Sequence, residues 1–389
     1  MRRVTAFDMP LFLCVLILVG LGIAFIYSAS YPKALASTDT GGDSFYYAGK
    51  QILFAVVVGL PALLACAFFP LEVFARHPAR KWFFWSVVAV VGLLMVLVLF
   101  MPDKHGNRAW LPTPLGPIQP SEFAKVAVVV LLPAFLCRRP WLMKSLRGLF
   151  HGPAWFLIIP VGMVILQKDL GTAFVMTLAI IVMLLIGGVK FRYVGIPALV
   201  LGLAAVLVVM KFGGSRIDRI GAWLDPERTH TNAGYQVLHS LIAVGSGGVL
   251  GRGFCQSLQK WSYVPGAQND SILAIIAEEM GFFLTLATIF LPFAFLIFRG
   301  FSIAHRAPDE FGALVAAGAT AMLATQAVVN MAVALNCIPT TGITLPFISS
   351  GGSSLIASLM MAGLLLNVSA MRPLSLRTGE PERAQPAAS

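Results

Sequence analysis

Apolar residues fill most of the chain in long runs that short polar segments separate. A helix of about 20 apolar residues crosses the ~30 Å hydrocarbon core of a bilayer, and most of the runs approach that length. Ten runs can be counted, over 10–29, 51–69, 82–100, 119–136, 154–167, 170–187, 191–210, 271–298, 311–336 and 345–369. The pattern predicts an all-α polytopic membrane protein, with residues 1–371 as one membrane domain.

The composition supports a membrane protein and excludes several other classes. Of the 389 residues, 58% are hydrophobic and 12% charged, which is too apolar for a soluble globule. The five cysteines are scattered, so neither a disulfide framework nor a metal cluster is indicated. A Walker-type GK[ST] motif is absent from the sequence, which leaves nucleotide-driven transport without support.

The positive charge of the chain indicates its orientation. The formal net charge is +11, and more than half of the 28 Lys and Arg residues fall in segments on the same side of the membrane as the two termini. Because short cytoplasmic loops are rich in basic residues, both termini are predicted to be cytoplasmic, and no nucleic-acid partner is needed to explain the charge. The segment 211–270 is then a long extracytoplasmic loop between the seventh and eighth helices. The tail 372–389, rich in Pro, Ala, Arg and Glu, is predicted to be disordered.

The unusual polar sequence collects on the outer side. It comprises HGNRAWLP (105–112), QPSEFAK (119–125), QKDLG (167–171), the segment 211–270 and IPTTGITLPFISSGGSS (338–354). The inner loops carry little besides basic residues. We therefore expect the protein to act at the outer face of the membrane.

Two of these motifs place charges at helix ends. Glu122 and Lys125 are three residues apart and share a helical face, where each costs roughly 3 kcal/mol at mid-bilayer unless paired or hydrated. They form either a structural ion pair or the lining of a polar cavity. Asp169 is expected to cap the helix that follows it, and Lys168 can reach a phosphate. Arg108 with Trp110 is either an interfacial anchor or part of a site.

The outer segment ends in a carboxylate at the start of an apolar helix. Residues 234–245 have the pattern of a short amphipathic surface helix, and the glycines between 245 and 253 allow a close backbone approach. Asp270 is either the N-cap of the next helix or a positioned base. Glu278 and Glu279 lie about 12 Å deeper, and Lys125 is a candidate partner for them. The motif ISSGGSS (348–354) fits tight helix packing or a backbone site for oxyanions.

The motifs together resemble the SEDS family of bacterial ten-helix glycan polymerases, typified by FtsW, RodA and SpoVE. QPSEFAK, DLGT, GYQ, SLIAVGSGG, QSLQK, AEEMG and PTTGITLPFISSGGSS follow in the family's order over nearly the whole chain. SLQKWSYVP and PTTGITLPFIS are more similar to FtsW than to RodA. The resemblance implies a peptidoglycan glycosyltransferase in the inner membrane. Its implied partners are lipid II, a class B penicillin-binding protein and other cell-division proteins.

The resemblance also implies which residues act. Asp270 matches the essential aspartate of the family. The candidate substrate-binding residues are Arg108, Trp110, Gln119, Ser121, Glu122, Lys125, Lys168, Asp169, Gln236, Lys260, Ser349, Gly351, Gly352 and Ser353. No metal ligand is proposed, although Mg²⁺ or Mn²⁺ could assist. The chain departs from the family where Gln268 and Asn269 replace the usual His and Thr before Asp270.

The sequence is compatible with three functions. As an inverting polymerase, the protein would use Asp270 to deprotonate the attacking sugar hydroxyl, and Arg108, Lys168 and Lys260 would offset the charge of the departing pyrophosphate. The polymerase would serve division or, alternatively, elongation. As a flippase, it would move lipid-linked sugars past its intramembrane charges. As an inactive scaffold, it would only hold a division partner.

Overall fold

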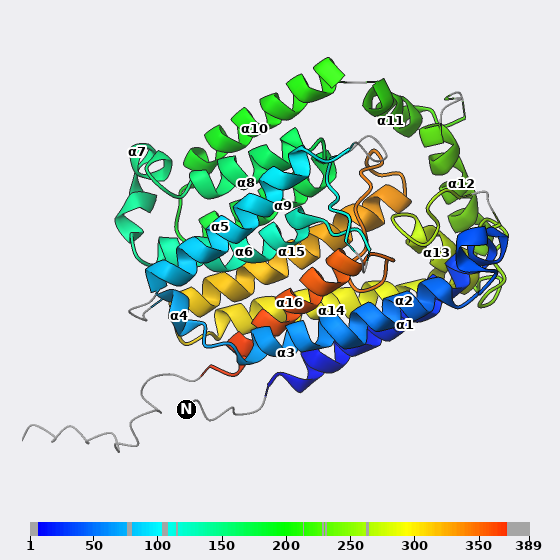
Figure 1. The fold of residues 1–389 in the computed structure, drawn as a ribbon, viewed down its shortest axis with the longest axis horizontal. Coiled ribbons are helices and arrows are strands. Elements are labelled where there is room, and N and C mark those ends of the chain that lie inside the picture. The colour runs from blue at the N-terminus through cyan, green and yellow to red at the C-terminus, as the bar shows by residue number, and fades with distance from the viewer. Residues whose placement is uncertain are drawn as a thin grey trace, which may run out of the picture.

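The structure is a computed structural model that describes residues 7–75, 80–102, 108–113, 116–212, 214–227, 229, 232–261 and 264–371. The predicted disordered tail, 372–389, lies outside these residues. The described residues form helices and their connections, and the only extended pairing among them is an isolated bridge between Leu111 and Ile118. The all-α prediction is confirmed (Figure 1).

Each of the ten predicted runs contains helix, although in the run 345–369 the helix begins only at Gly352. The elements are α1 (Met9–Ala36), η1 (Thr38–Thr40), α2 (Tyr46–Leu53), η2 (Phe54–Gly59), α3 (Leu60–Phe68), α4 (Glu72–Ala75), α5 (Arg80–Leu99), α6 (Pro120–Leu136), η3 (Pro140–Lys144), α7 (Leu146–Phe150), α8 (Trp155–Leu166), α9 (Leu170–Ile186), α10 (Phe191–Phe212), α11 (Gly214–Leu224), α12 (Asn232–Gly247), α13 (Ile272–Thr285), η4 (Leu286–Phe290), α14 (Leu291–His305), α15 (Glu310–Ala334) and α16 (Gly352–Ser369). Within the described residues, six helical stretches are long and apolar enough to span a membrane, and shorter apolar helices accompany them.

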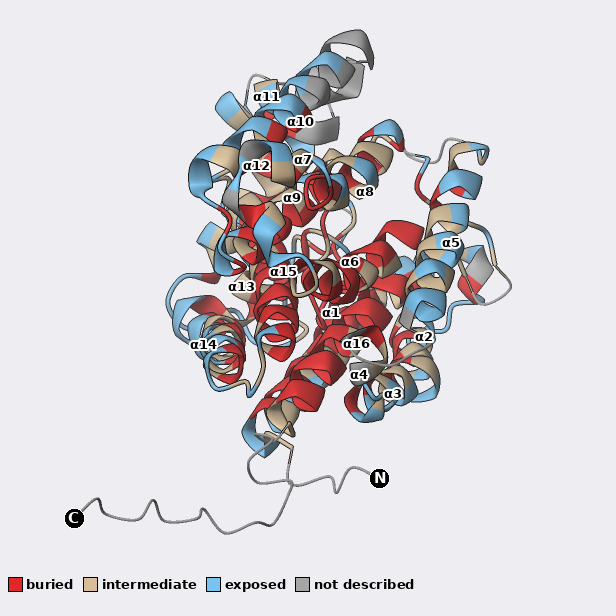
Figure 2. Ribbon diagram, turned by 90° about the vertical axis from the view of Figure 1, so that its left-hand side faces the viewer, coloured by how far each residue is buried: buried red, intermediate tan, exposed pale blue. Residues whose placement is uncertain are grey.

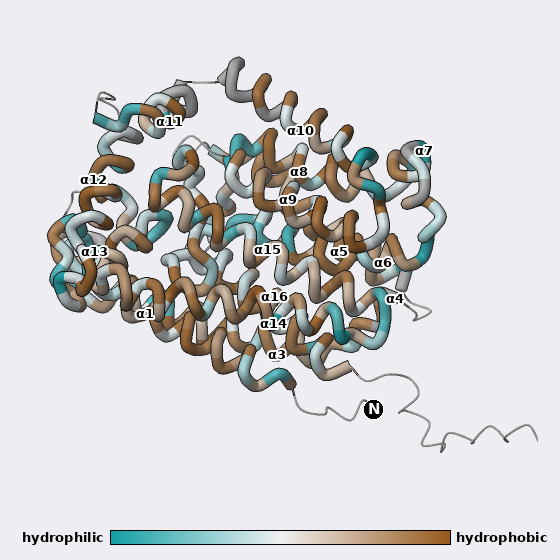
Figure 3. Tube along the Cα trace, turned by 180° about the vertical axis from the view of Figure 1, so that it is seen from behind, coloured by the Kyte–Doolittle hydropathy of each residue, from teal (hydrophilic) through white to brown (hydrophobic). Residues whose placement is uncertain are grey.

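The helices lie side by side in one bundle whose centre is formed by α15, α16 and α6. Buried residues concentrate on these three helices, whereas α3, α5 and α14 expose much of their surface (Figure 2). Apolar residues dominate the length of the bundle, and much of the polar sequence lies in the connections at its two ends (Figure 3). This distribution is that of a protein whose outer surface contacts lipid.

The two described ends of the chain meet at one end of the bundle. The Asp8 backbone N–H donates to Ser369 Oγ at 3.2 Å, and Arg299 Nε lies 2.7 Å from Asp8 Oδ2. An even number of crossings requires the ends to share a side. The distribution of basic residues assigns that side to the cytoplasm. The opposite end, where α11 and α12 lie, is then the outer end.

The outer segment 211–270 contains more helix than its polarity suggested. The predicted surface helix over 234–245 is confirmed as α12, whereas α11 was not predicted. α11 is fastened to the loop after α15, because Trp223 Nε1 donates to the Asn336 carbonyl at 3.0 Å and Asn336 Nδ2 donates to the Trp223 carbonyl at 3.3 Å. The long loop is therefore a structured cover at the outer end of the bundle.

The run 271–298 is not one continuous crossing helix, as the sequence suggested, because it breaks at Gly281. This residue has φ 69° and ψ −174°, which only glycine adopts readily. The helical stretch Ile272–His305 would be about 51 Å long at 1.5 Å per residue, well beyond the ~30 Å hydrocarbon core. The break divides it into a short outer half-helix, 272–280, and a long segment that crosses the membrane.

The backbone groups freed by the break are satisfied by residues 248–253. The carbonyls of Glu278 and Glu279 accept from the N–H groups of Arg252 and Gly253 at 3.0 and 2.9 Å, and Phe282 N–H donates to the Gly248 carbonyl at 2.9 Å. The predicted close approach of this glycine-rich segment is thus an approach to the broken helix. Its cause is the need to pair every buried backbone group.

Replacement of Gly281 by alanine is expected to destabilise the protein by about 2 kcal/mol or more. An added Cβ would lie 2.2 Å from the Gly251 nitrogen, in a backbone conformation that alanine avoids. The matched control is Gly20→Ala on α1, where no atom lies within 4 Å of the added Cβ. Thermal unfolding in detergent should show a lower midpoint for Gly281→Ala and no loss for the control. Equal midpoints would contradict the inferred role of the break.

Candidate active site

Four helices begin close together at the outer end of the bundle. α6, α9, α13 and α16 all run from the outer end inward. Gln119, which precedes α6, donates through Nε2 to Asp169 Oδ2 at 2.7 Å and through its backbone N–H to Ser353 Oγ at 3.4 Å. Ser350 N–H donates to the Gln268 carbonyl at 2.9 Å. Because helix N-termini carry partial positive charge and unpaired N–H groups, this region favours an anion.

Asp270 lies on the turn that leads into α13, and its carboxylate is not used to cap that helix. The N-cap is Ser271, and it makes no side-chain capping bond, so the N-cap prediction for Asp270 is wrong. Gln236 Nε2 lies 3.4 Å from Asp270 Oδ2 and 3.0 Å from Ser271 Oγ. Gly266, at φ +66°, leaves room for the carboxylate, since a Cβ there would lie 3.0 Å from Oδ1. Asp270 is therefore held in place, half-buried and without a competing structural task.

The surroundings of Asp270 raise the pKa of its carboxyl group. Burial is the main cause, because it disfavours the charged form. Backbone N–H groups of Asp270 and Ser271, the Gln236 amide and the charge of Arg219 oppose this effect by stabilising the carboxylate. The net result is a stronger base than an exposed aspartate.

Glu122 and Lys125 form a buried ion pair, which confirms the first of the two interpretations of this motif. Lys125 Nζ lies 2.8 Å from both Glu122 carboxylate oxygens and donates to Gln326 Oε1 at 2.7 Å. The two charged residues are 4% and 1% exposed, so the pairing offsets a large desolvation cost. These charges therefore give no support to a path for lipid headgroups across the membrane.

Two amides on α15 that were not among the predicted site residues connect the parts of the site. Gln326 Nε2 donates to the Thr344 carbonyl at 3.1 Å and lies 3.3 Å from Ser354 Oγ. Asn330, one turn later, donates through Nδ2 to the carbonyls of Asp270 and Ile343 at 2.9 and 2.7 Å. A signal was present, because two amides in the apolar run 311–336 need partners inside the membrane.

The turn before α9 brings several predicted residues together. Asp169 Oδ1 accepts from Thr172 N–H at 3.1 Å, which confirms the predicted cap. Lys168 has a φ of 64°, a conformation that non-glycine residues seldom adopt. Arg108 is exposed, and its backbone N–H donates to the Gln167 carbonyl at 3.1 Å. Arg108, Lys168 and Asp169 therefore lie around the same turn, and the half-buried Trp110 follows two residues after Arg108.

Glu278 and Glu279 do not pair with Lys125, and that prediction is wrong. Lys260 Nζ lies 3.1 Å from Glu279 Oε1, which also accepts from Ser28 Oγ at 2.5 Å. Glu278 accepts from Leu258 N–H at 3.0 Å. The carboxylates thus fasten residues 257–260 to the half-helix of α13. Within the described residues, Lys260 Nζ is engaged by Glu279 and Ser28, and no hydrogen bond joins it to Asp270.

Of the remaining candidate residues, Ser349, Gly351 and Gly352 stabilise the turn and packing at the start of α16, whereas Ser121 has a hydroxyl that is available to a ligand. Ser349 Oγ accepts from Leu345 N–H at 2.8 Å, which stabilises the turn before α16. Gly352 packs against Phe54, whose ring would lie 3.0 Å from an added Cβ, and Gly351 precedes it as the N-cap of α16. Ser121 is buried, and among the described residues its hydroxyl has no hydrogen-bond partner. Such a group is available to water or substrate.

A dedicated metal site is not apparent in the described part of the chain. No group of three or more His, Cys, Asp or Glu residues there is arranged to hold an ion. Mg²⁺ is often bound by one or two carboxylates together with substrate phosphates. The half-buried carboxylate of Asp270 could serve in that way.

The fold and this outer site define a polytopic membrane protein with one polar site at the outer mouth of its helical bundle. The family described as "Cell cycle protein", which comprises FtsW, RodA and SpoVE, matches residues 9–373. The chain belongs to this family.

Proteins similar to the chain share nearly its full length. Stage V sporulation protein E of Bacillus subtilis (strain 168) is 38% identical over 371 residues, which cover 94% of this chain and 97% of that protein. The probable peptidoglycan glycosyltransferase FtsW of Geobacter sp. (strain M18) is 36% identical over 375 residues, which cover 95% and 98%.

Two solved structures have the same fold. The structure titled "Structural coordination of polymerization and crosslinking by a peptidoglycan synthase complex" contains a chain with a TM-score of 0.71 and 26% identity, and the match covers 94% of this chain and 98% of that one. The rod shape determining protein RodA of Thermus thermophilus has a TM-score of 0.64 and 27% identity, with 95% and 98% covered.

Replacement of Lys125 by methionine is expected to destabilise the protein by about 3–5 kcal/mol, because it leaves Glu122 buried without its cation. The double variant Lys125→Met/Glu122→Gln should recover much of this loss. Thermal unfolding of both proteins in the same detergent measures the difference. If the single and double variants unfold at the same temperature, the loss of stability in Lys125→Met does not come from leaving the Glu122 carboxylate unpaired.

Proposed function

We propose that this protein, a peptidoglycan glycosyltransferase of the family to which it belongs, polymerises lipid II into glycan strands at the outer face of the inner membrane. Asp270 is the general base. The observation that carries the proposal is the placement of this carboxylate. It is half-buried at the outer mouth of the bundle, where Gln236 contacts it, and it does not cap α13. A backbone hydrogen bond from Ser350 to Gln268 joins its turn to the loop before α16.

The geometry supports an inverting transfer in one step. Asp270 takes the proton from the sugar hydroxyl of an incoming lipid II as that oxygen attacks the anomeric carbon of the growing lipid-linked chain. The pyrophosphate leaves with its own negative charge, so it needs electrostatic stabilisation more than a general acid. The N-termini of α6, α9 and α16 together with Arg108 and Lys168 can supply that stabilisation. Lys260, engaged by Glu279, has no part in this step.

Division is the proposed cellular role, and a class B penicillin-binding protein is the proposed partner. The similar proteins include several named FtsW, and SpoVE of Bacillus subtilis acts by its name in sporulation. The similar structure of a complex that couples polymerization and crosslinking supports a crosslinking partner. The site of action would be the division septum. Complementation of strains depleted of their division or elongation polymerase tests this role, and rescue of the elongation strain alone would overturn it.

Replacement of Asp270 by asparagine is expected to lower the rate of polymerisation by about 10²–10⁴-fold, because the amide cannot accept the proton. The measurement is glycan formation from labelled lipid II by the reconstituted protein with its crosslinking partner. Asp43→Asn is the matched control, since Asp43 is an exposed carboxylate of another outer loop. Polymer formed by Asp270→Asn at the wild-type rate would refute the assignment. Full complementation of a depletion strain by Asp270→Ala would instead favour an inactive scaffold.

The rate of polymerisation should also decline as the pH is lowered, and this decline should begin at a higher pH than it would with an ordinary aspartate as the base. The base must be deprotonated, and burial raises the pKa of Asp270 above the usual value of about 3.9. Gln236→Leu removes a donor that favours the carboxylate, so its rate should begin to fall at a still higher pH. Rates of polymerisation measured against pH for both proteins provide the test. A wild-type rate that stays constant down to about pH 4 would contradict it.

A further inference from the structure

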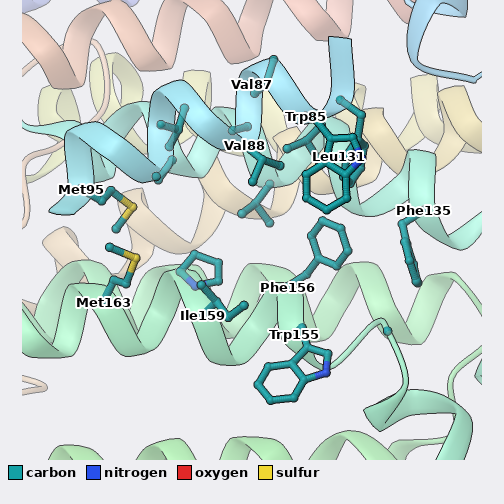
Figure 4. A pocket seen from close by; sticks show the side chains of 18 of the residues that line it. Trp85, Val87, Val88, Met95, Leu131, Phe135, Trp155, Phe156, Ile159 and Met163 are labelled. Atoms are coloured by element: carbon teal, nitrogen blue, oxygen red, sulfur yellow. The ribbon is translucent and has the colours of Figure 1, made fainter. Parts of the chain in front are cut away.

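A large apolar groove lies between α5, α6 and α8. Its volume is about 510 Å³, and its walls include Val88 and Met95 of α5, Leu131 of α6, and Phe156 and Met163 of α8 (Figure 4). The groove opens on the lipid-facing side of the bundle. None of the described residues that line it is acidic.

Basic residues line one end of this groove. Lys81 lies at the start of α5, Arg138 and Arg139 follow α6, and His151 precedes α8. Arg138 is anchored there by a hydrogen bond from Nη2 to the Phe74 carbonyl. The Arg139 guanidinium lies 5.5 Å from the centre of the Phe135 ring, over the apolar wall. The inner ends of three helices thus present cations above an apolar channel.

The position of the groove identifies the leaflet that it faces. The basic end lies at the end of the bundle where the chain begins and ends, which the distribution of basic residues assigns to the cytoplasm. From Lys81 to Met95 the groove follows α5 for about 21 Å at 1.5 Å per residue. Half of the ~30 Å hydrocarbon core is about 15 Å, so the groove runs through the depth of the inner leaflet and continues past the middle of the membrane. Trp85 and Trp155, both largely exposed, mark the headgroup level.

In a bilayer such a groove is filled by lipid. Its walls are too apolar to hold water, and an unfilled gap would forfeit dispersion contacts along three helices. A hydrocarbon chain alone would place no requirement on charge at the end of the groove. The cluster of cations, without a lining carboxylate, selects a lipid whose headgroup carries a net negative charge, because a zwitterionic headgroup brings its own cation to balance the phosphodiester.

We propose that this groove is a binding site for an anionic glycerophospholipid of the inner leaflet. One acyl chain lies between α5 and α8 on the surface of α6, and the phosphodiester contacts Lys81 and Arg139. The lipid fills the space between two helices that both pack on α6. The site is distinct from the outer mouth and does not depend on the proposed function.

The test is native mass spectrometry of the full chain from micelles that contain equal amounts of phosphatidylglycerol and phosphatidylethanolamine. The wild type is expected to retain phosphatidylglycerol in preference. Lys81→Gln/Arg139→Gln should lower its retention about tenfold or more, since each basic residue near the surface strengthens binding several-fold. Gly92→Phe should abolish retention by filling the groove, because no atom lies within 4 Å of a Cβ added at Gly92.

Two matched controls separate the groove from general effects. Lys190→Gln/Arg192→Gln removes the same charge from another inner loop, and Gly162→Phe adds the same ring to α8 at an equally open position outside the lining. Both should retain phosphatidylglycerol as the wild type does. The proposal would be overturned if the wild type retained both lipids equally. It would also be overturned if the groove variants retained as much phosphatidylglycerol as the wild type. Displacement by a polyprenyl phosphate, or by the transmembrane helix of a copurified partner, would also overturn it.

Discussion

The pairing between the break in α13 and residues 248–253 is the interaction on which the outer half of this protein depends. A helix interrupted at Gly281 would leave backbone groups unpaired at the edge of the membrane. The glycine-rich segment supplies the missing partners, and Glu278 and Glu279 hold the loop that follows it. The half-helix is thereby fixed in direction, and Asp270 stands at its start. The turn that carries Asp270 is thus positioned because backbone groups at the edge of the membrane must all be hydrogen-bonded.

α15 connects this outer assembly to the core of the bundle. Gln326 contacts the Glu122–Lys125 pair, and Asn330 contacts the backbone of Asp270. Both amides also hold the loop after α15. One buried helix therefore sets the relative positions of α6, α13 and α16 through side-chain amides. Such amides hold the helices in place without adding charge, and a charge inside the membrane would cost several kcal/mol.

The sequence revealed the crossings and the outer location of the polar motifs because both follow from hydrophobicity and charge, which are local properties. It also revealed the cap at Asp169, where the signal is a single residue next to a helix. It did not reveal the break at Gly281, since a glycine in an apolar run is compatible with a continuous helix. The partners of Glu278, Glu279 and Lys125 also escaped, because contacts between distant segments depend on how the bundle packs. The roles of the candidate residues rest on the family and stay proposals.

The bond between the Gln268 carbonyl and the Ser350 N–H has a consequence for substitutions at this turn. It ties the turn before Asp270 to the loop before α16 through main-chain atoms alone. Any amino acid that accepts the backbone conformation can therefore occupy position 268 without loosening this tie. The Gln268 and Asn269 side chains therefore take no part in this tie. The position of the aspartate relative to α16 thus depends on the path of the main chain and not on the side chain at position 268.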